Sequence, residues 1–191
     1  MSDSVDLMRV AAVVGSLREK SFNRGVMRAA MELAPAGMVV ADVPIGDLPH
    51  FNDDLDVNGG PDVVRQFRTR IQEADALLFV TPEYNYSIPG VLKNAIDWAS
   101  RPSGRAAILG KPAAVMGAAT GRSGTMRAQL HLRQIFVTLD IHGLNKPELF
   151  IPFAPEKFDD AGNVTDPAVR EQIEKQLVAL QQWVNRLQGA T

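Results

Sequence analysis

The 191-residue chain contains no cysteine. This absence excludes disulfides, thiolate nucleophiles, iron–sulfur clusters and zinc sites built on sulfur. Any redox chemistry of this protein must therefore depend on a bound cofactor.

The chain also lacks a large charge of either sign and any long hydrophobic run. Its net charge is −2, with 22% charged and 46% apolar residues, which is typical of a soluble globular protein. Contacts to a nucleic-acid backbone require a basic excess, so we expect no nucleic-acid partner. Residues 1–9 are acidic, and no stretch approaches the roughly 18 apolar residues of a membrane span. We expect a single domain over residues 1–191, no membrane insertion and a cytoplasmic location.

Short apolar runs alternate with stretches of helical periodicity, which indicates repeated strand–helix units. The pattern predicts strands at 10–14, 38–43, 77–81, 113–116 and 147–151, and helices at 24–33, 62–73, 91–100, 125–139 and 167–187. Residues 152–166, rich in Pro, Gly and Asp, are predicted to form one long surface loop. The expected fold class is α/β: a flavodoxin-like, doubly wound, five-stranded parallel sheet in the order 2-1-3-4-5.

In this topology ligands bind beyond the carboxyl ends of strands one and three. The loop at 15–24 follows the first strand and opens a helix, where free N–H groups and the positive dipole end favour a phosphate. Ser16, Ser21 and Asn23 add neutral donors and Arg18 adds a charged one. The loop has neither G-x-G-x-x-G nor a GK[ST] ending, so it suits one terminal phosphate. In the alternative interpretation, Ser21 and Asn23 only cap the helix and Arg18 is a surface charge.

The loop at 81–90 follows the third strand. Pro82 and Pro89 restrict its backbone, so that its polar groups can meet the hydrogen-bonding edge of a planar heterocycle. Tyr84 and Tyr86 are the only tyrosines of the chain, and their position favours a pocket role over simple packing of the turn. Glu83 either caps a helix or faces solvent. A third loop, 117–124, contains three glycines that allow close approach of backbone to a ring, or that form a simple turn.

These motifs resemble the NADPH-dependent FMN reductase family, and within it the bacterial quinone, chromate and azo-dye reductases. The likeness rests on residues 15–18, 21–24, 82–90, 92–98, 130–134 and 145–148, and it covers the chain from Val10 to about Leu149. It implies that the FMN phosphate is bound by Ser16, Arg18, Ser21 and Asn23. It also implies contacts to the isoalloxazine, partly through backbone, from Pro82, Glu83, Tyr84 and Asn85, and a site completed by Ser87, Ala119, Thr120 and Gly121. Relatives often carry serines where this chain has Ala118 and Ala119.

The resemblance further implies a ping-pong cycle. NAD(P)H delivers hydride to the flavin and leaves, and a quinone, chromate, an azo or nitro compound or free flavin then takes the electrons. Because the cofactor performs this chemistry, we assign no catalytic acid, base or nucleophile, and no metal site. A homodimer or homotetramer is implied as well. The helix that carries Trp98 is a candidate contact, although a buried core tryptophan is equally consistent with the sequence.

An electron carrier, a hydrolase and a calcium site agree less well with the sequence. A flavodoxin-type electron carrier without its own NAD(P)H turnover is usually strongly acidic, which a net charge of −2 does not support. A hydrolase is disfavoured because there is no G-x-S-x-G elbow and the three histidines show no triad context. The segment Asp54-x-Asp56-x-Asn58-Gly59 copies the start of a calcium loop, but Arg65 stands where the bidentate glutamate is needed. We interpret it as an acidic turn.

Overall fold

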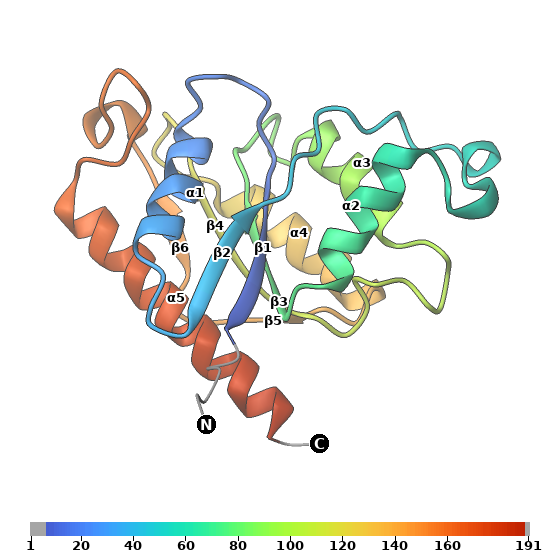
Figure 1. The fold of residues 1–191 in the computed structure, drawn as a ribbon. Coiled ribbons are helices and arrows are strands. Elements are labelled where there is room, and N and C mark those ends of the chain that lie inside the picture. Colours follow the sequence, from blue (N-terminus) through green and yellow to red (C-terminus); the bar gives the residue numbers. More distant parts are fainter. Residues whose placement is uncertain (1–6, 190–191) are drawn as a thin grey trace.

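The computed structural model describes residues 7–189, and its central feature is one parallel β-sheet (Figure 1). The strands are β1 (Met8–Val14), β2 (Met38–Asp42), β3 (Ala76–Val80), β4 (Pro112–Ala118), β5 (His142–Gly143) and β6 (Leu149–Ile151). The strand order is β2-β1-β3-β4-β5, and β6 also pairs with β4. The flavodoxin-like order predicted from the sequence is confirmed.

The fifth position of the sheet is shared by two short strands, so the prediction of one strand at 147–151 was wrong in this respect. β5 pairs with the beginning of β4 and β6 with its end. At the gap between them, Gln176 donates from Nε2 to the carbonyl oxygens of Val115 (3.1 Å) and Pro147 (2.8 Å). A buried side chain thus supplies hydrogen bonds that an uninterrupted strand would have supplied, which buried backbone carbonyls require.

Five α-helices cover the two faces of the sheet. They are α1 (Phe22–Glu32), α2 (Asp62–Gln72), α3 (Gly90–Ala99), α4 (Met126–Thr138) and α5 (Pro167–Gln188). Helices α1 and α5 pack on one face, and α2, α3 and α4 pack on the other (Figure 1). Each helix lies within about two residues of its predicted range, because its apolar spacing was regular enough to mark it.

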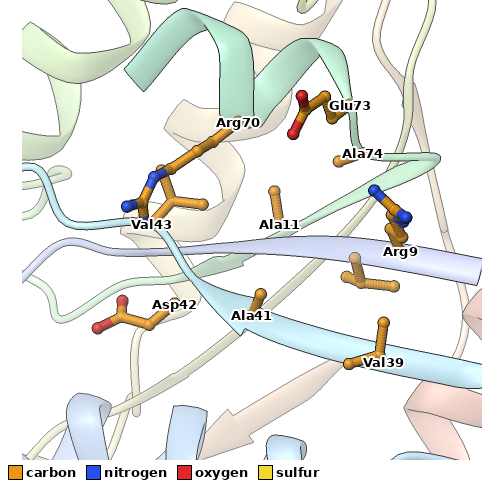
Figure 2. Close-up of a pocket in the computed structure, with 10 residues that line it drawn as sticks. Arg9, Ala11, Val39, Ala41, Asp42, Val43, Arg70, Glu73 and Ala74 are labelled. Carbon is orange, nitrogen blue, oxygen red and sulfur yellow. The ribbon is translucent and has the colours of Figure 1, made fainter. Parts of the chain in front are cut away.

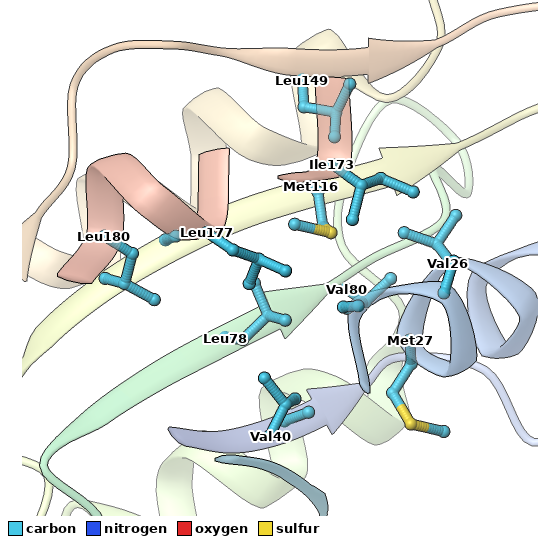
Figure 3. Packing of buried hydrophobic residues seen from close by; sticks show 14 of the residues in the cluster. Val26, Met27, Val40, Leu78, Val80, Met116, Leu149, Ile173, Leu177 and Leu180 are labelled. Carbon is cyan, nitrogen blue, oxygen red and sulfur yellow. The ribbon is translucent and has the colours of Figure 1, made fainter. Parts of the chain in front are cut away.

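The central strand β3 is apolar throughout because both of its faces are buried. In β3, Leu78 and Val80 face α1 and α5, whereas Leu77 and Phe79 face the three helices opposite. Figure 3 shows Leu78 and Val80 packed with Leu177 and Val26 from the covering helices. Full burial of one such side chain contributes about 1.5–3 kcal/mol, so the two clusters together hold the sheet between its helices.

Residues 152–166 form the predicted loop before α5, but the loop contains a 3-10 turn at Ala154–Glu156 and is partly buried. Phe158 and Val164 are buried and form an antiparallel bridge, and we call residues 158–164 the brace. The brace packs so closely on α1 that a Cβ atom at Gly25 would overlap the carbonyl oxygen of Gly162. Arg28 fastens this contact through hydrogen bonds to Asn163 Oδ1 at 2.9 and 2.7 Å. The brace therefore supports the first turns of α1 from outside the sheet.

The longest helix of the described chain, α5, has 22 residues and is amphipathic. Within residues 7–189, no helix combines the length and the apolar character needed to cross a bilayer. The cytoplasmic location stays a prediction.

Candidate functional site

The three predicted loops meet in a crevice of about 230 Å³ at the carboxyl ends of β1, β3 and β4. This is the position that the strand order favours for a ligand. The crevice is lined by Ser16, Arg18, Ser21, Phe22, Asn23, Pro82, Glu83, Tyr84, Ala118, Ala119 and Thr120. Most of the predicted site residues are therefore brought together, whereas Asn85, Ser87 and Gly121 lie outside the lining. Phe22 was not predicted to line the crevice, because its local sequence does not show whether its side chain lines the crevice or packs in the core.

The first loop keeps its polar groups free for a ligand. Ser16 and Ser21 are each 4% exposed, yet neither hydroxyl takes part in a hydrogen bond found within residues 7–189. Ser21 is the N-cap residue of α1 by backbone conformation, but its side chain accepts no bond from the first turn. Arg18 has no ion-pair partner within the described chain and lies over the Phe22 ring at 5.7 Å. Unpaired helix N–H groups, two hydroxyls without a protein partner and a free guanidinium suit an anion such as a phosphate.

Asn23 holds the first loop to the third. Its Nδ2 donates to the carbonyl oxygen of Ala118, and its Oδ1 accepts from the N–H of Ala118, both at 2.9 Å. The side chain thus satisfies both backbone groups at the end of β4 and retains one Nδ2 hydrogen that faces no protein partner. Asn23 lines the crevice, but most of its bonding capacity is used within the protein.

The second loop contains a tight hairpin turn whose shape does not depend on a ligand. Tyr84 and Ser87 exchange backbone hydrogen bonds at 3.0 and 2.9 Å. Asn85 and Tyr86 between them have φ values of 49° and 67°. Two successive positive φ values are the mark of a type I′ turn. The turn points Tyr84 to the crevice, whereas Tyr86 lies outside the lining, under the guanidinium of Arg127 at 3.7 Å from the ring centroid.

Glu83 caps a helix, which was one of the two alternatives left by the sequence. Its carboxylate accepts from the N–H groups of Arg127 (3.0 Å) and Ala128 (3.2 Å) in the first turn of α4. It also accepts from Arg127 Nε at 2.6 Å and forms an ion pair with the same guanidinium. Because the carboxylate is fully occupied, only the backbone of Glu83 is available to a ring in the crevice.

The third loop forms a wall built mainly from backbone. A Cβ atom at Gly117 would overlap the carbonyl oxygen of Thr81, so glycine is required where β4 passes the end of β3. Ala119 is bonded through its N–H to Ile151 (3.0 Å) and through its carbonyl to Ala154 (3.1 Å). Thr120 supplies the one side-chain hydroxyl of this wall. The third loop therefore offers a ring its backbone groups and the Thr120 hydroxyl.

A second crevice, of about 240 Å³, lies between α2 and the β1–β2 side of the sheet (Figure 2). Val39, Ala41 and Ala11 line its sheet side, and Arg70 and Glu73 border it from α2. It runs along β1 and β2, and Arg9 and Asp42 are the polar side chains on its sheet side. We interpret it as a part of the sheet that α2 leaves uncovered.

Trp98 is buried in the core, which is one of the two alternatives left by the sequence. A subunit contact through its helix stays a prediction. The side chain of Trp98 is fully buried, and its Nε1 donates to the carbonyl oxygen of Pro49 at 2.7 Å. Phe51 packs edge-on against it, with ring centroids 4.9 Å apart. Trp98 therefore anchors the segment after β2 to α3.

Polar residues outside the crevice show no grouping that suggests separate chemistry. His131 contacts Ser87 Oγ through Nδ1 at 3.0 Å. Asp56, in the calcium-like segment, pairs with Arg68 at 2.7 Å. No cluster of metal-ligating side chains occurs in the part of the chain that the structure describes.

Comparisons with known proteins agree with this geometry. The family model for NADPH-dependent FMN reductases matches residues 8–156. An NAD(P)H-dependent FMN reductase of Pseudomonas aeruginosa is 51% identical over 189 residues, which cover 99% of this chain and 100% of the relative. An NADPH:quinone oxidoreductase of Arabidopsis thaliana is 48% identical, with 96% and 95% of the two chains covered. Among solved structures, the flavoenzyme NAD(P)H:(acceptor) oxidoreductase FerB of Paracoccus denitrificans superposes with a TM-score of 0.86 at 38% identity, covering 94% and 98%.

Proposed function

The chain belongs to the NADPH-dependent FMN reductase family, and on this premise we propose that it binds FMN in the crevice and reduces quinones with NAD(P)H. It is an enzyme, as its full-length relatives near 50% identity are. The observation that carries the proposal is that the largely buried residues Ser16 and Ser21, beside the first turn of α1, leave their hydroxyls without a partner in the described chain. We infer that the whole chain forms one FMN-binding domain, because all its strands join one sheet.

The residues that line the crevice can bind both the phosphate and the ring of FMN. Ser16, Ser21 and the first N–H groups of α1 would bind the phosphate, and Arg18 would add a charge-assisted bond. The backbone from Pro82 to Tyr84 would face the ring, with Ala119 and Thr120 on the opposite side. Asn23 and Glu83 act in this arrangement chiefly by holding the loops in place.

FMN supplies the redox chemistry when it is bound, since it takes hydride from a nicotinamide and passes electrons onward. The protein binds and orients the reactants. We propose a ping-pong order in which NAD(P)⁺ leaves before the acceptor binds, because one crevice serves both. Quinones are the proposed acceptors, in line with the names of the relatives, and chromate, azo and nitro compounds and free flavin are further candidates for the same open site.

We also propose a homodimer formed through α4. Met126, Leu130 and Val137 lie on one stripe of this helix, and all three are exposed, Val137 by 84%. The stripe adjoins the site, because α4 also contacts the second loop through Arg127 and His131. Size-exclusion chromatography with light scattering should show a dimer for the parent and a monomer for Val137→Glu combined with Leu130→Glu. A parent that is monomeric at micromolar concentration refutes this interface.

Anaerobic titration tests the proposed function directly. The purified protein should bind FMN near one equivalent, NADPH should bleach the oxidised flavin absorbance, and a quinone should restore it. Initial rates at several quinone concentrations should give parallel double-reciprocal lines. A protein that binds no FMN, or whose FMN stays oxidised under NADPH, would not be the proposed enzyme. Rapid bleaching in a stopped-flow instrument also separates it from a flavodoxin-type carrier.

A further inference from the structure

Glu83 is the only acidic residue among those that line the described crevice. It stands between Pro82 and Tyr84, in the segment that would face the ring, and its side chain is 6% exposed. A carboxylate in such a place is screened little by water, so its field reaches the crevice unless other charges offset it.

Arg127 and the start of α4 offset that charge. The carboxylate accepts two N–H bonds at the positive end of the helix dipole, and it pairs with the guanidinium of Arg127. The guanidinium is itself held in place from two further sides. Its Nη2 donates to Ser123 Oγ at 2.7 Å, and its plane lies over the Tyr86 ring.

From this arrangement, and resting on the proposed function, we propose that Arg127 tunes the redox potential of the bound FMN by neutralising Glu83. Charge near a flavin alters the ease with which it accepts electrons, and an unbalanced carboxylate makes reduction harder. Arg127 is a positioning and tuning residue in this scheme, since it reaches the flavin site only through Glu83. The same pair joins the second loop to α4, so a change in either partner has a structural and an electrostatic effect that must be separated.

The two partners can be distinguished because their removal should shift the potential in opposite directions. Arg127→Met leaves the carboxylate without its cation, so the midpoint potential should fall and hydride uptake from NADPH should slow about tenfold. Glu83→Gln keeps the shape but leaves the cation unbalanced, so the midpoint potential should rise. In the double variant, the midpoint potential should return towards the value of the parent protein. A purely structural pair would instead give two shifts of the same sign, or weaker FMN binding without any shift.

The experiment uses the FMN-loaded protein. Midpoint potentials are measured by reduction with xanthine and xanthine oxidase against reference dyes, FMN affinity by fluorescence, and hydride uptake by stopped flow. Arg122→Met is the matched control, because Arg122 is an exposed arginine of the third loop without an ion-pair partner in the described chain. It removes the same charge and should leave the potential within error of the parent.

Two outcomes overturn the proposal: a potential that falls or stays constant in Glu83→Gln, or an Arg122→Met shift as large as that of Arg127→Met. If Arg127→Met does not retain FMN, Arg127→Lys replaces it and should keep the parent potential, while Glu83→Gln still has to raise it. Failure of the proposed function is distinguished by the anaerobic titration of the parent protein. In that case the parent binds no FMN, or NADPH does not reduce its bound FMN.

Discussion

The two loops that form the crevice are stabilised in opposite ways. In the first, Ser16, Ser21 and Arg18 leave their polar groups unpaired within the described chain, and the support comes from the brace behind α1. In the second, the backbone turn closes on itself and Glu83 is bound to α4. The first loop therefore lacks partners that a ligand would supply, whereas the second already has its own.

This difference predicts where ligand binding adds stability. A ligand that binds only the folded state stabilises it by an amount that grows with its concentration and its affinity, and the partners it supplies act where the protein has none. Phosphate binding should therefore order the first loop most. The following substitutions test this contrast, beginning with the largest expected effect.

Gly25→Ala should damage the support of the first loop. The new Cβ would overlap the carbonyl of Gly162, and overpacking against backbone costs about 3 kcal/mol in the free energy of unfolding. Urea unfolding of the flavin-free protein measures this loss, and the affinity for FMN should fall with it.

Gly90→Ala is the matched control in the second loop. No atom lies within 4 Å of a Cβ atom built at Gly90, and this glycine begins α3. The substitution should leave stability within about 0.5 kcal/mol of the parent or raise it slightly. Equal losses at both positions would contradict the contrast between the loops.

Asn23→Ala tests whether this residue is chiefly a link or a ligand. The substitution leaves the N–H and the carbonyl of Ala118 without their partner, and we expect a loss of about 2.5 kcal/mol in the free energy of unfolding. Affinities for FMN and riboflavin, measured by fluorescence quenching, should fall by the same factor. A selective loss for FMN would show instead that the remaining Nδ2 hydrogen binds the phosphate.

Arg18→Ala should have the selective effect that Asn23→Ala lacks. A hydrogen bond to a charged group contributes about 2 kcal/mol, so FMN binding should weaken roughly 30-fold. Riboflavin has no phosphate, and its affinity should stay unchanged. Thermal unfolding of the flavin-free variant should match the parent, because Arg18 has no ion-pair partner within residues 7–189. Equal losses for both flavins would remove the phosphate role.

The sequence predicted the sheet order and the place of the crevice because both depend on local signals. Buried parallel strands such as β3 are apolar without interruption, and helix periodicity marked α5 from Val169 to Val184. The carboxyl ends of the strands then located the site by topology alone.

Contacts between distant segments were not predictable in the same way. The two-residue β5 has no apolar run, and the brace depends on two glycines, Gly25 and Gly162, that are far apart in the chain. Glu83 is separated from Arg127 by 44 residues. The sequence alone therefore could not show which helix Glu83 caps, or whether it caps one at all. The sequence could not decide between a core and an interface position for Trp98, because an aromatic residue on a helix suits both equally.

Acid should loosen the brace, which is the smallest of the expected effects. The pKa of Asp159 is lowered from 3.8, first by the backbone hydrogen bond from Asn163 and then by the bond from the Asn163 side chain. A carboxyl group with a depressed pKa in the folded state adds stability above its unfolded pKa and loses it as the pH falls through the folded value. The contribution should thus be complete above pH 5 and disappear progressively below about pH 4.

Hydrogen exchange of the flavin-free protein can follow this loosening residue by residue. In the parent, the amides of Ala161 and Asn163, which donate to Asp159 at 3.0 and 2.7 Å, should lose protection between pH 5 and pH 3, relative to the intrinsic rates. Asp159→Asn should remove this pH dependence, because the neutral amide does not titrate. The Ser87 amide of the second loop, bonded to the Tyr84 carbonyl, provides the reference and should respond equally in both proteins. Parallel pH profiles for parent and variant at Ala161 would show that the brace is not held by this carboxylate, and that the first loop owes its support to the Gly25–Gly162 contact and the Arg28–Asn163 hydrogen bonds.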